Sequence, residues 1–147
     1  MWINRAIWPR ASRWSDMIKG IGVDIVEIER IQKAIDSKRD RFINRIFTSD
    51  EQEYCFGKPR PSRHFAARFA AKEAVSKALG TGKKGMRWTD VEVCRDGKGC
   101  PFIKLTGGAA ERASANGICD VAISLSFNRN NAVASAVAMG SGQTRAI

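Results

Sequence analysis

The sequence is poor in residues that build zinc sites and in long apolar runs. It has one histidine, His64, and its four cysteines form no C-x-x-C pair, so the ligand spacing of a structural zinc site is absent. No apolar run approaches the roughly 20 residues that cross a bilayer. These absences exclude the zinc-module and membrane-spanning classes. They predict a soluble cytoplasmic protein with free thiols rather than disulfides at Cys55, Cys94, Cys100 and Cys119.

Acidic residues are scarce relative to basic ones. The chain has 15 Asp and Glu residues against 25 Lys and Arg residues, which gives a formal net charge of +10. This excess favours an acidic partner, and nucleic acid, an anionic membrane surface, a phosphorylated ligand and an acidic protein all fit it. The length of 147 residues and the hydrophobic content of 44% predict one globular domain with its own core.

The two ends of the chain lack the patterning of its middle. Residues 1–16 hold three tryptophans and three arginines without periodicity, and they lack the continuous apolar core of a secretory signal. We expect residues 1–16 to be an extension, either disordered or the product of an upstream start. Residues 17–140 form the predicted domain, and 141–147 form a tail.

Hydrophobic periodicity predicts an α+β fold. We expect a strand over 17–26, two short helices with apolar residues over 28–35 and 42–47, and a further helix opened by an S-x-x-Q capping box over 49–52. A long helix over 63–79 ends at Gly80. A β-hairpin over 91–105, a helix over 108–115 and strands over 121–127 and 133–139 follow. Strands grouped in hairpins indicate a single domain with a mainly antiparallel sheet packed against the long helix.

The first strand has one nearly bare face. Ile21, Val23 and Ile25 alternate with Gly20, Gly22 and Asp24. Two glycines leave room for a ligand or another backbone to approach closely, and packing against a helix is the alternative explanation. A carboxylate in an apolar strand is costly to bury without a compensating cation, so the sequence predicts a partner for Asp24.

The long helix carries a second carboxylate beside lysines. Phe69, Glu73 and Lys77 share one face, and we expect Arg68 and Lys72 to project next to it. The simplest explanation is a solvated ion pair between Glu73 and Lys77. Two carboxylates would also suit a glycosidase, but a lysine and the glycine- and lysine-rich loop at 80–85 favour phosphate chemistry with Mg²⁺ held by Asp24 and Glu73.

Several strings resemble one enzyme family. They are Gly20 to Ile25 with Arg30 six residues past Asp24, the run from Arg68 to Ala78, Gly80-Thr81-Gly82, Gly99-Cys100-Pro101 and Ser124-Leu125-Ser126. In this order they are similar to the holo-acyl-carrier-protein synthases, the small 4′-phosphopantetheinyl transferases. The resemblance covers roughly residues 17–139 and implies the fold of that family.

The resemblance implies transfer of 4′-phosphopantetheine from coenzyme A to a serine of apo acyl carrier protein, with release of 3′,5′-ADP, in support of fatty acid biosynthesis. Asp24 and Glu73 match the magnesium carboxylates, and all of Asp24, Glu73 and Lys77 match catalytic positions. Lys77 matches the lysine that steadies the phosphates and the leaving group. Glu73, directly or through a metal-bound water, is the candidate to accept the serine proton.

Further matches concern coenzyme A and partners. Arg68, Lys77, Thr81, Gly82 and Pro101 match positions around coenzyme A, and Arg30 matches the arginine that begins the carrier-docking helix. An acidic carrier protein would account for the positive charge, with neither nucleic acid nor a membrane as partner. Family members are typically trimers with coenzyme A sites between subunits, so a homotrimer is implied, and the apolar alternation of the last strands would partly serve its interface.

One departure from the family pattern stands at Phe127. Many relatives have a histidine after the Ser-x-Ser, and we expect weaker coenzyme A binding here with the chemistry intact. His64 is expected to be a helix-start or partly buried histidine rather than a substitute, and Ser124 and Ser126 can be explained as the solvent side of a half-buried strand. Two other hypotheses stay open: a non-catalytic basic module that binds nucleic acid, and a broader-specificity or inactive relative of the transferases.

Overall fold

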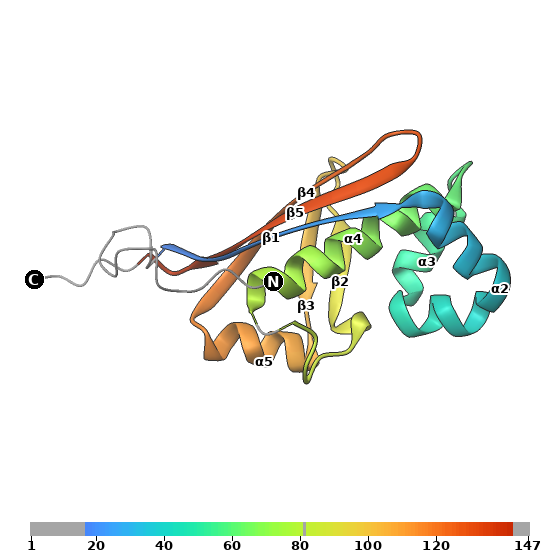
Figure 1. Cartoon of the computed structure of the whole chain (residues 1–147). Coiled ribbons are helices and arrows are strands. Elements are labelled where there is room, and N and C mark those ends of the chain that lie inside the picture. The colour runs from blue at the N-terminus through green and yellow to red at the C-terminus, as the bar shows by residue number, and fades with distance from the viewer. Residues whose placement is uncertain (1–16, 81, 143–147) are drawn as a thin grey trace, which may run out of the picture.

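A three-stranded antiparallel sheet is the framework of the molecule. The computed structural model describes residues 17–80 and 82–142. The strands are β1 (Ile18–Glu27), β5 (Asn131–Gly140) and β4 (Ile118–Phe127), in the spatial order β1-β5-β4. Figure 1 shows these long strands running beside the helix α4 (Pro61–Leu79). The chain is therefore a single α+β domain, as the periodicity predicts.

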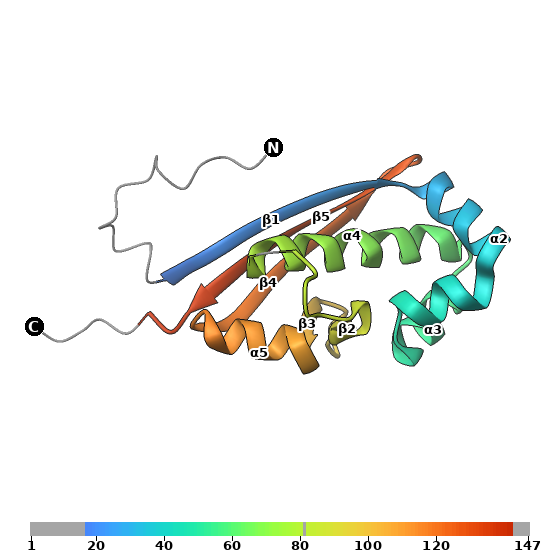
Figure 2. The same cartoon turned by 60° about the horizontal axis from the view of Figure 1, so that its bottom comes forward.

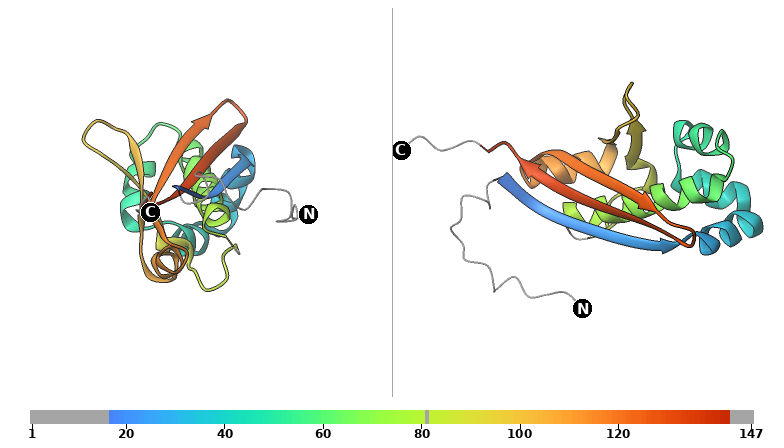
Figure 3. Two further views of the ribbon diagram at one scale, coloured as in Figure 1. Left: turned by 90° about the vertical axis from the view of Figure 1, so that its left-hand side faces the viewer. Right: turned by 90° about the horizontal axis from the view of Figure 1, so that it is seen from above.

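Helix α4 lies at the centre of the domain. It packs along β1, β5 and β4 on one side, and β2 (Val91–Arg95) and α5 (Gly107–Ala115) contact it from the other (Figure 2). Helices α2 (Ile28–Ile46) and α3 (Ser49–Phe56) gather at one end of the sheet. The 3₁₀ turn η2 (Trp88–Asp90) leads into the hairpin of β2 and β3 (Pro101–Leu105). Seen from above, the strands follow nearly the whole length of α4 (Figure 3).

Most predicted elements are confirmed, with one local difference. The two short helices expected after β1 are confirmed, since α2 consists of two helical segments separated by a kink at Lys38, where the backbone leaves helical angles. The capping box of α3 lies one residue earlier than predicted. Thr48 is the N-cap and accepts from the Glu51 backbone N–H, while the Glu51 carboxylate accepts from the Thr48 N–H. The predicted extension 1–16 and residues 143–147 of the tail lie outside the described residues.

The bare face of β1 packs against α4, so the alternative explanation of its glycines is confirmed. A Cβ atom at Gly20 would lie 1.9 Å from the Ala78 carbonyl oxygen, and one at Gly22 would lie 1.8 Å from the Ala74 carbonyl oxygen. Real Cβ atoms do not approach so closely, and only glycine lets the strand and helix backbones touch. The strand thereby brings Asp24, which follows on the same face, next to α4.

The opposite face of the sheet is apolar and exposed. Ile21, Val23 and Ile25 are 70%, 59% and 66% exposed. They pair with Val137, Ser135 and Val133 of β5, whose side chains share this face. The exposed Ser124 and Ser126 of β4 lie beside them, which confirms that these serines are on the solvent side of the strand. The alanines of β5, in contrast, are buried against α4.

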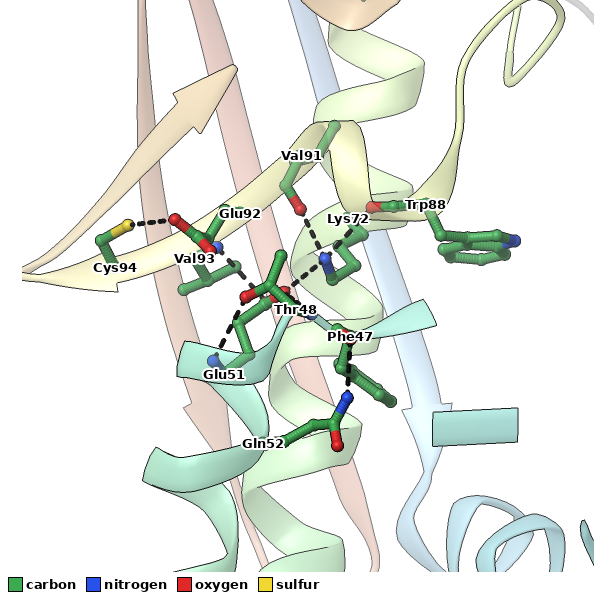
Figure 4. A network of polar contacts seen from close by, with 10 residues as sticks. All are labelled: Phe47, Thr48, Glu51, Gln52, Lys72, Trp88, Val91, Glu92, Val93 and Cys94. Carbon is green, nitrogen blue, oxygen red and sulfur yellow. Dashed lines mark hydrogen bonds and ion pairs between the residues drawn. The ribbon is translucent and has the colours of Figure 1, made fainter. Parts of the chain in front are cut away.

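A buried ion pair joins α3, α4 and β2 (Figure 4). The Lys72 ammonium donates to the Glu51 carboxylate at 2.7 Å and to the carbonyls of Trp88 and Val91. The other Glu51 oxygen accepts from the Val93 N–H. Burial lowers the pKa of Lys72, and the adjacent Glu51 carboxylate opposes this shift. Lys72 is thus a core residue, and the prediction that it projects beside the face of Glu73 is wrong.

Candidate active site

Four charged side chains meet where β1 runs alongside α4. The Lys77 ammonium of α4 donates to an Asp24 carboxylate oxygen at 3.1 Å and to the Val23 carbonyl at 2.9 Å. Glu73, one turn earlier on the helix, accepts from Lys83 at 2.5 Å. Burial lowers the pKa of Lys83, whereas the nearby carboxylates of Glu73 and Asp24 raise it, so the two ion pairs form one cluster.

The predicted pairing of Glu73 with Lys77 along the helix does not form. Lys77 instead reaches across to β1, because the close approach at Gly22 places Asp24 opposite that turn of α4. Glu73 takes its partner from the loop after α4. The structure thus places Asp24, Glu73 and Lys77 at one location, with the two carboxylates coming from separate elements.

Lys83 rests on an aromatic support. Its ammonium lies 3.2 Å from the centroid of the Trp88 ring, which stacks on Phe69 with centroids 4.9 Å apart. Phe69 precedes Glu73 by one turn and so extends the same face of α4. Burial lowers the pKa of Lys83, while its hydrogen bond to Glu73 opposes the shift. Sequence reasoning did not single out Lys83, because its position depends on the path of the loop.

A cavity opens beside this support. Its volume is about 680 Å³, and it lies between the end of α2 and the segment that leads into β2. Three cationic side chains are among its lining residues, which suits an anionic ligand. The lining residues are Asn44, Arg45, Lys83, Met86, Arg87, Trp88 and Thr89.

Arg68 lies in a second group of basic and aromatic residues. It is only 1% exposed, and its guanidinium lies 3.9 Å from the centroid of the Tyr54 ring. Within the described residues its Nε is a buried donor without a hydrogen-bond partner. Lys58 and Arg95 also lie over the Tyr54 ring. Arg68 therefore does not join the face of Glu73, although it precedes that residue on the same helix.

His64 and Phe127 meet in this second group. Their ring centroids lie 5.5 Å apart in an edge-to-face arrangement, and the centroids of Tyr54 and His64 lie 5.9 Å apart, also edge to face. Arg63 lies over the Phe127 ring. Burial, followed by the nearby charge of Arg68, lowers the pKa of His64. His64 is a partly buried residue in the first turn of α4, as predicted, and the fold also brings it to Phe127 at the end of β4.

Arg112 of α5 supports the loop after α4, which sequence reasoning did not detect. Its guanidinium donates to the carbonyl oxygens of Gly80, at 3.0 Å, and of Gly82 and Lys84. Gly80 and Gly82 have positive φ angles of 87° and 63°, which turn the chain sharply at the helix end. Thr81, a predicted coenzyme A residue, lies outside the described residues.

The remaining predicted residues are not in contact with the four-charge cluster in the described part of the chain. Pro101 begins β3 and pairs across the hairpin with Arg95. Arg30 is exposed in the first turns of α2, three residues after β1 ends. Residues 17–80 and 82–142 contain no group of three or more His, Cys, Asp or Glu side chains that could hold a metal ion. A metal at Asp24 and Glu73 would therefore take only two protein carboxylates.

The chemistry of the site suits a phosphorylated ligand. Two oxygen-donor carboxylates beside lysines match the way Mg²⁺ is held by one or two carboxylates and by substrate phosphates. The four cysteines are free, and burial raises the pKa of Cys55 to about 12, so this thiol is a poor nucleophile. None of the helices in the described residues is long and apolar enough to span a membrane.

Comparison with known proteins identifies the class. Residues 20–129 match the 4′-phosphopantetheinyl transferase superfamily. The holo-[acyl-carrier-protein] synthase of Alkaliphilus oremlandii is 47% identical over 123 residues, which cover 84% of this chain and all of that protein.

Crystal structures of proteins with this fold point to the same class. The crystal structure of the synthase from Neisseria meningitidis has a TM-score of 0.77 at 32% identity and covers 83% of this chain and 98% of its own. The synthase of Bacillus anthracis, in complex with CoA (3′,5′-ADP), has a TM-score of 0.70 at 38% identity over 85% of this chain and 99% of its own.

The fold and the match define a phosphopantetheinyl transferase. The chain belongs to the 4′-phosphopantetheinyl transferase superfamily and, within it, to the holo-[acyl-carrier-protein] synthase family of enzymes.

Proposed function

We propose that this chain transfers 4′-phosphopantetheine from coenzyme A to a serine of apo acyl carrier protein and releases 3′,5′-ADP. The observation that carries the proposal is the meeting of Asp24 and Glu73 with Lys77 at the contact of β1 with α4. The names of the relatives and the coenzyme A complex of the Bacillus anthracis structure support the choice of substrates.

The two carboxylates fit Mg²⁺. They offer oxygen donors from two rigid elements, and lysines now neutralise each of them, so the position already accommodates positive charge. Asp24 and Glu73 would hold the ion, which would supply charge neutralisation for the pyrophosphate of coenzyme A. Lys77, held by the Val23 carbonyl, is placed to contact the phosphates from the same side.

Glu73 is our candidate for the general base. It accepts the proton of the carrier serine, directly or through a water, while the serine oxygen attacks the phosphorus and 3′,5′-ADP leaves. The 28% exposure of the Glu73 side chain leaves it accessible to a docked carrier. Lys77 stabilises the negative charge that develops on the leaving group. Positioning and electrostatics therefore provide most of the catalysis.

Coenzyme A is proposed to contact Arg68, Thr81, Gly82 and Pro101 as well as Lys77. The unpartnered Nε of Arg68 and the cations around Tyr54 support a phosphate position there. Gly82 has a positive φ angle, and its backbone lies just after the end of α4, where it would contact coenzyme A. Pro101 lies away from the four-charge cluster, which is consistent with a site completed by a neighbouring subunit.

Arg30 is proposed to dock the carrier. It is exposed on α2, and α2 begins four residues after Asp24, so a carrier bound there would hold its serine near the carboxylates. An acidic carrier would be attracted by the net charge of +10. We further propose a homotrimer that uses the exposed apolar face of β1, and a role in fatty acid biosynthesis in the cytoplasm.

The test is mass spectrometry of apo acyl carrier protein incubated with the full chain, coenzyme A and Mg²⁺. We expect the mass to rise by one phosphopantetheine group. Glu73→Gln should lower the rate at least about 100-fold, because it removes both a metal ligand and the base. The matched control is Glu111→Gln, an exposed carboxylate on α5, which should retain the wild-type rate. A Glu73→Gln variant as fast as the control would overturn the assignment.

A further inference from the structure

Lys83 has an environment that the transfer reaction does not itself require. It comes from the loop after α4 rather than from β1 or the helix that carry the carboxylates. Its ammonium lies 2.5 Å from a Glu73 oxygen and 3.2 Å from the centroid of the Trp88 ring. With 25% of its side chain exposed, it is more enclosed than Lys77 at 46%. Lys83 is therefore held by a built arrangement and is not a freely solvated surface lysine.

The Lys83 ammonium would compete with a metal ion for the Glu73 carboxylate. It neutralises Glu73 and also interacts with the Asp24 charge, so a divalent cation shared by both carboxylates would meet a positive charge at its edge. Lys77 is different, because the Val23 carbonyl gives its ammonium a second partner outside the carboxylate pair. Of the two lysines, Lys83 is the one whose hydrogen bond in the described structure goes only to the proposed metal ligand.

Trp88 offers the displaced ammonium a position of its own. A cation over an indole ring is stabilised by the ring quadrupole, and Phe69, stacked on Trp88, helps to hold that ring in place. The lysine can therefore leave Glu73 without losing every partner. The adjoining cavity, lined by Trp88 and Lys83, provides room for this movement.

We propose that Lys83 is an internal counter-cation for Glu73 that a divalent metal ion displaces, and that it thereby sets the metal concentration at which the site fills. This inference rests on the proposed function, since it takes Asp24 and Glu73 as the metal ligands. It assigns to Lys83 a regulatory part rather than a catalytic one, because its contact is with a metal ligand and not with the reacting atoms.

Direct binding of Mn²⁺ tests the proposal without any transfer reaction. The full chain, without coenzyme A, is titrated with Mn²⁺ at constant pH and ionic strength, and free Mn²⁺ is followed by electron paramagnetic resonance. Lys83→Met keeps an apolar stem against Trp88 and removes the charge, and we expect it to bind Mn²⁺ about tenfold more tightly than wild type. Lys84→Met is the matched control: it removes the same charge from the neighbouring, exposed residue, and it should change the dissociation constant less than about twofold.

The outcomes separate this inference from the proposed function. Equal affinities of the Lys83→Met and Lys84→Met variants, or weaker binding by Lys83→Met, would overturn the role of Lys83 while the metal site stands. Binding that is unchanged by Glu73→Gln, or no binding by the wild type at millimolar Mn²⁺, would overturn the metal assignment and this inference with it. Lys83→Gln gives a second variant in case the methionine form does not fold, and it should shift affinity in the same direction.

Discussion

At the scale of single residues, the site depends on which lysine meets which carboxylate. Asp24 and Glu73 could be chosen from the sequence because each is a carboxylate in an apolar or alanine-rich segment, with a lysine one turn from Glu73. Their partners could not be chosen, since helical spacing favours Glu73 with Lys77, whereas the structure pairs Lys77 with Asp24 and Lys83 with Glu73. A long flexible side chain selects its partner from the tertiary surroundings.

The contact of His64 with Phe127 leads to a pH-dependent prediction. Burial and the charge of Arg68 lower the pKa of His64 from its ordinary value of 6.5. Below pH 6.5 the unfolded chain therefore binds a proton more readily than the folded chain. The contribution of neutral His64 to the free energy of unfolding is therefore fully present above pH 6.5. It falls as the pH drops from 6.5 toward the lowered pKa.

Urea unfolding at about pH 7.5 and about pH 5.5 measures this effect. The wild type should lose more stability between the two values than His64→Gln, which has no imidazole to protonate. If both proteins lose the same amount, His64 is not the titrating group.

At the scale of elements, the fit of β1 on α4 positions the carboxylates. Gly22→Ala would place a methyl group 1.8 Å from the Ala74 carbonyl oxygen, so the strand or the helix must move. We expect a loss of about 3 kcal/mol in the free energy of unfolding, measured by denaturant titration. Gly97→Ala in the hairpin turn has nothing within 4 Å of the added methyl and should change stability by less than about 0.5 kcal/mol. Equal effects at both glycines would refute the close-contact explanation.

The elements were more predictable than their ends and their packing. Periodicity predicts every long strand and α4, because alternation and the alanine-rich run are local properties. It misplaces the α3 cap, since Thr48 with Glu51 and Ser49 with Gln52 are equally good capping boxes in sequence. Tertiary contacts decide between them: Glu51 also receives Lys72 and the Val93 N–H, which only the fold brings near.

Contacts between distant segments are the part of the site that sequence reasoning could not reach. Arg112 of α5 holds the loop that carries Gly82, and His64 of α4 meets the end of β4. No spacing rule links such residues. The residues themselves predicted Mg²⁺ at Asp24, and the resemblance to the transferase family supplied coenzyme A as the ligand of Arg68. Lys83 was noticed only as part of a basic loop.

At the scale of the whole molecule, the apolar outer face of the sheet is exposed to solvent in a single chain, which is unfavourable unless another molecule covers it. Ile21, Val23 and Ile25 form an exposed row on a strand that also carries Asp24. Large exposed apolar patches mark interfaces, and the resemblance to the family implies three subunits, so we expect the wild type to sediment as a trimer. Val23→Asp should dissociate it, whereas Ser114→Asp on the exposed side of α5 should not. A wild type that sediments as a monomer at all concentrations would contradict the trimer.

We propose that Asp24 and Glu73 together hold the divalent cation on which transfer depends. The most direct measurement is an anomalous difference map from crystals of the full chain grown with Mn²⁺ and coenzyme A. We expect a peak within bonding distance of both carboxylates, in contact with the coenzyme A phosphates, and the Lys83 ammonium moved off Glu73. A peak that contacts neither or only one of the two carboxylates, with coenzyme A bound, would contradict it.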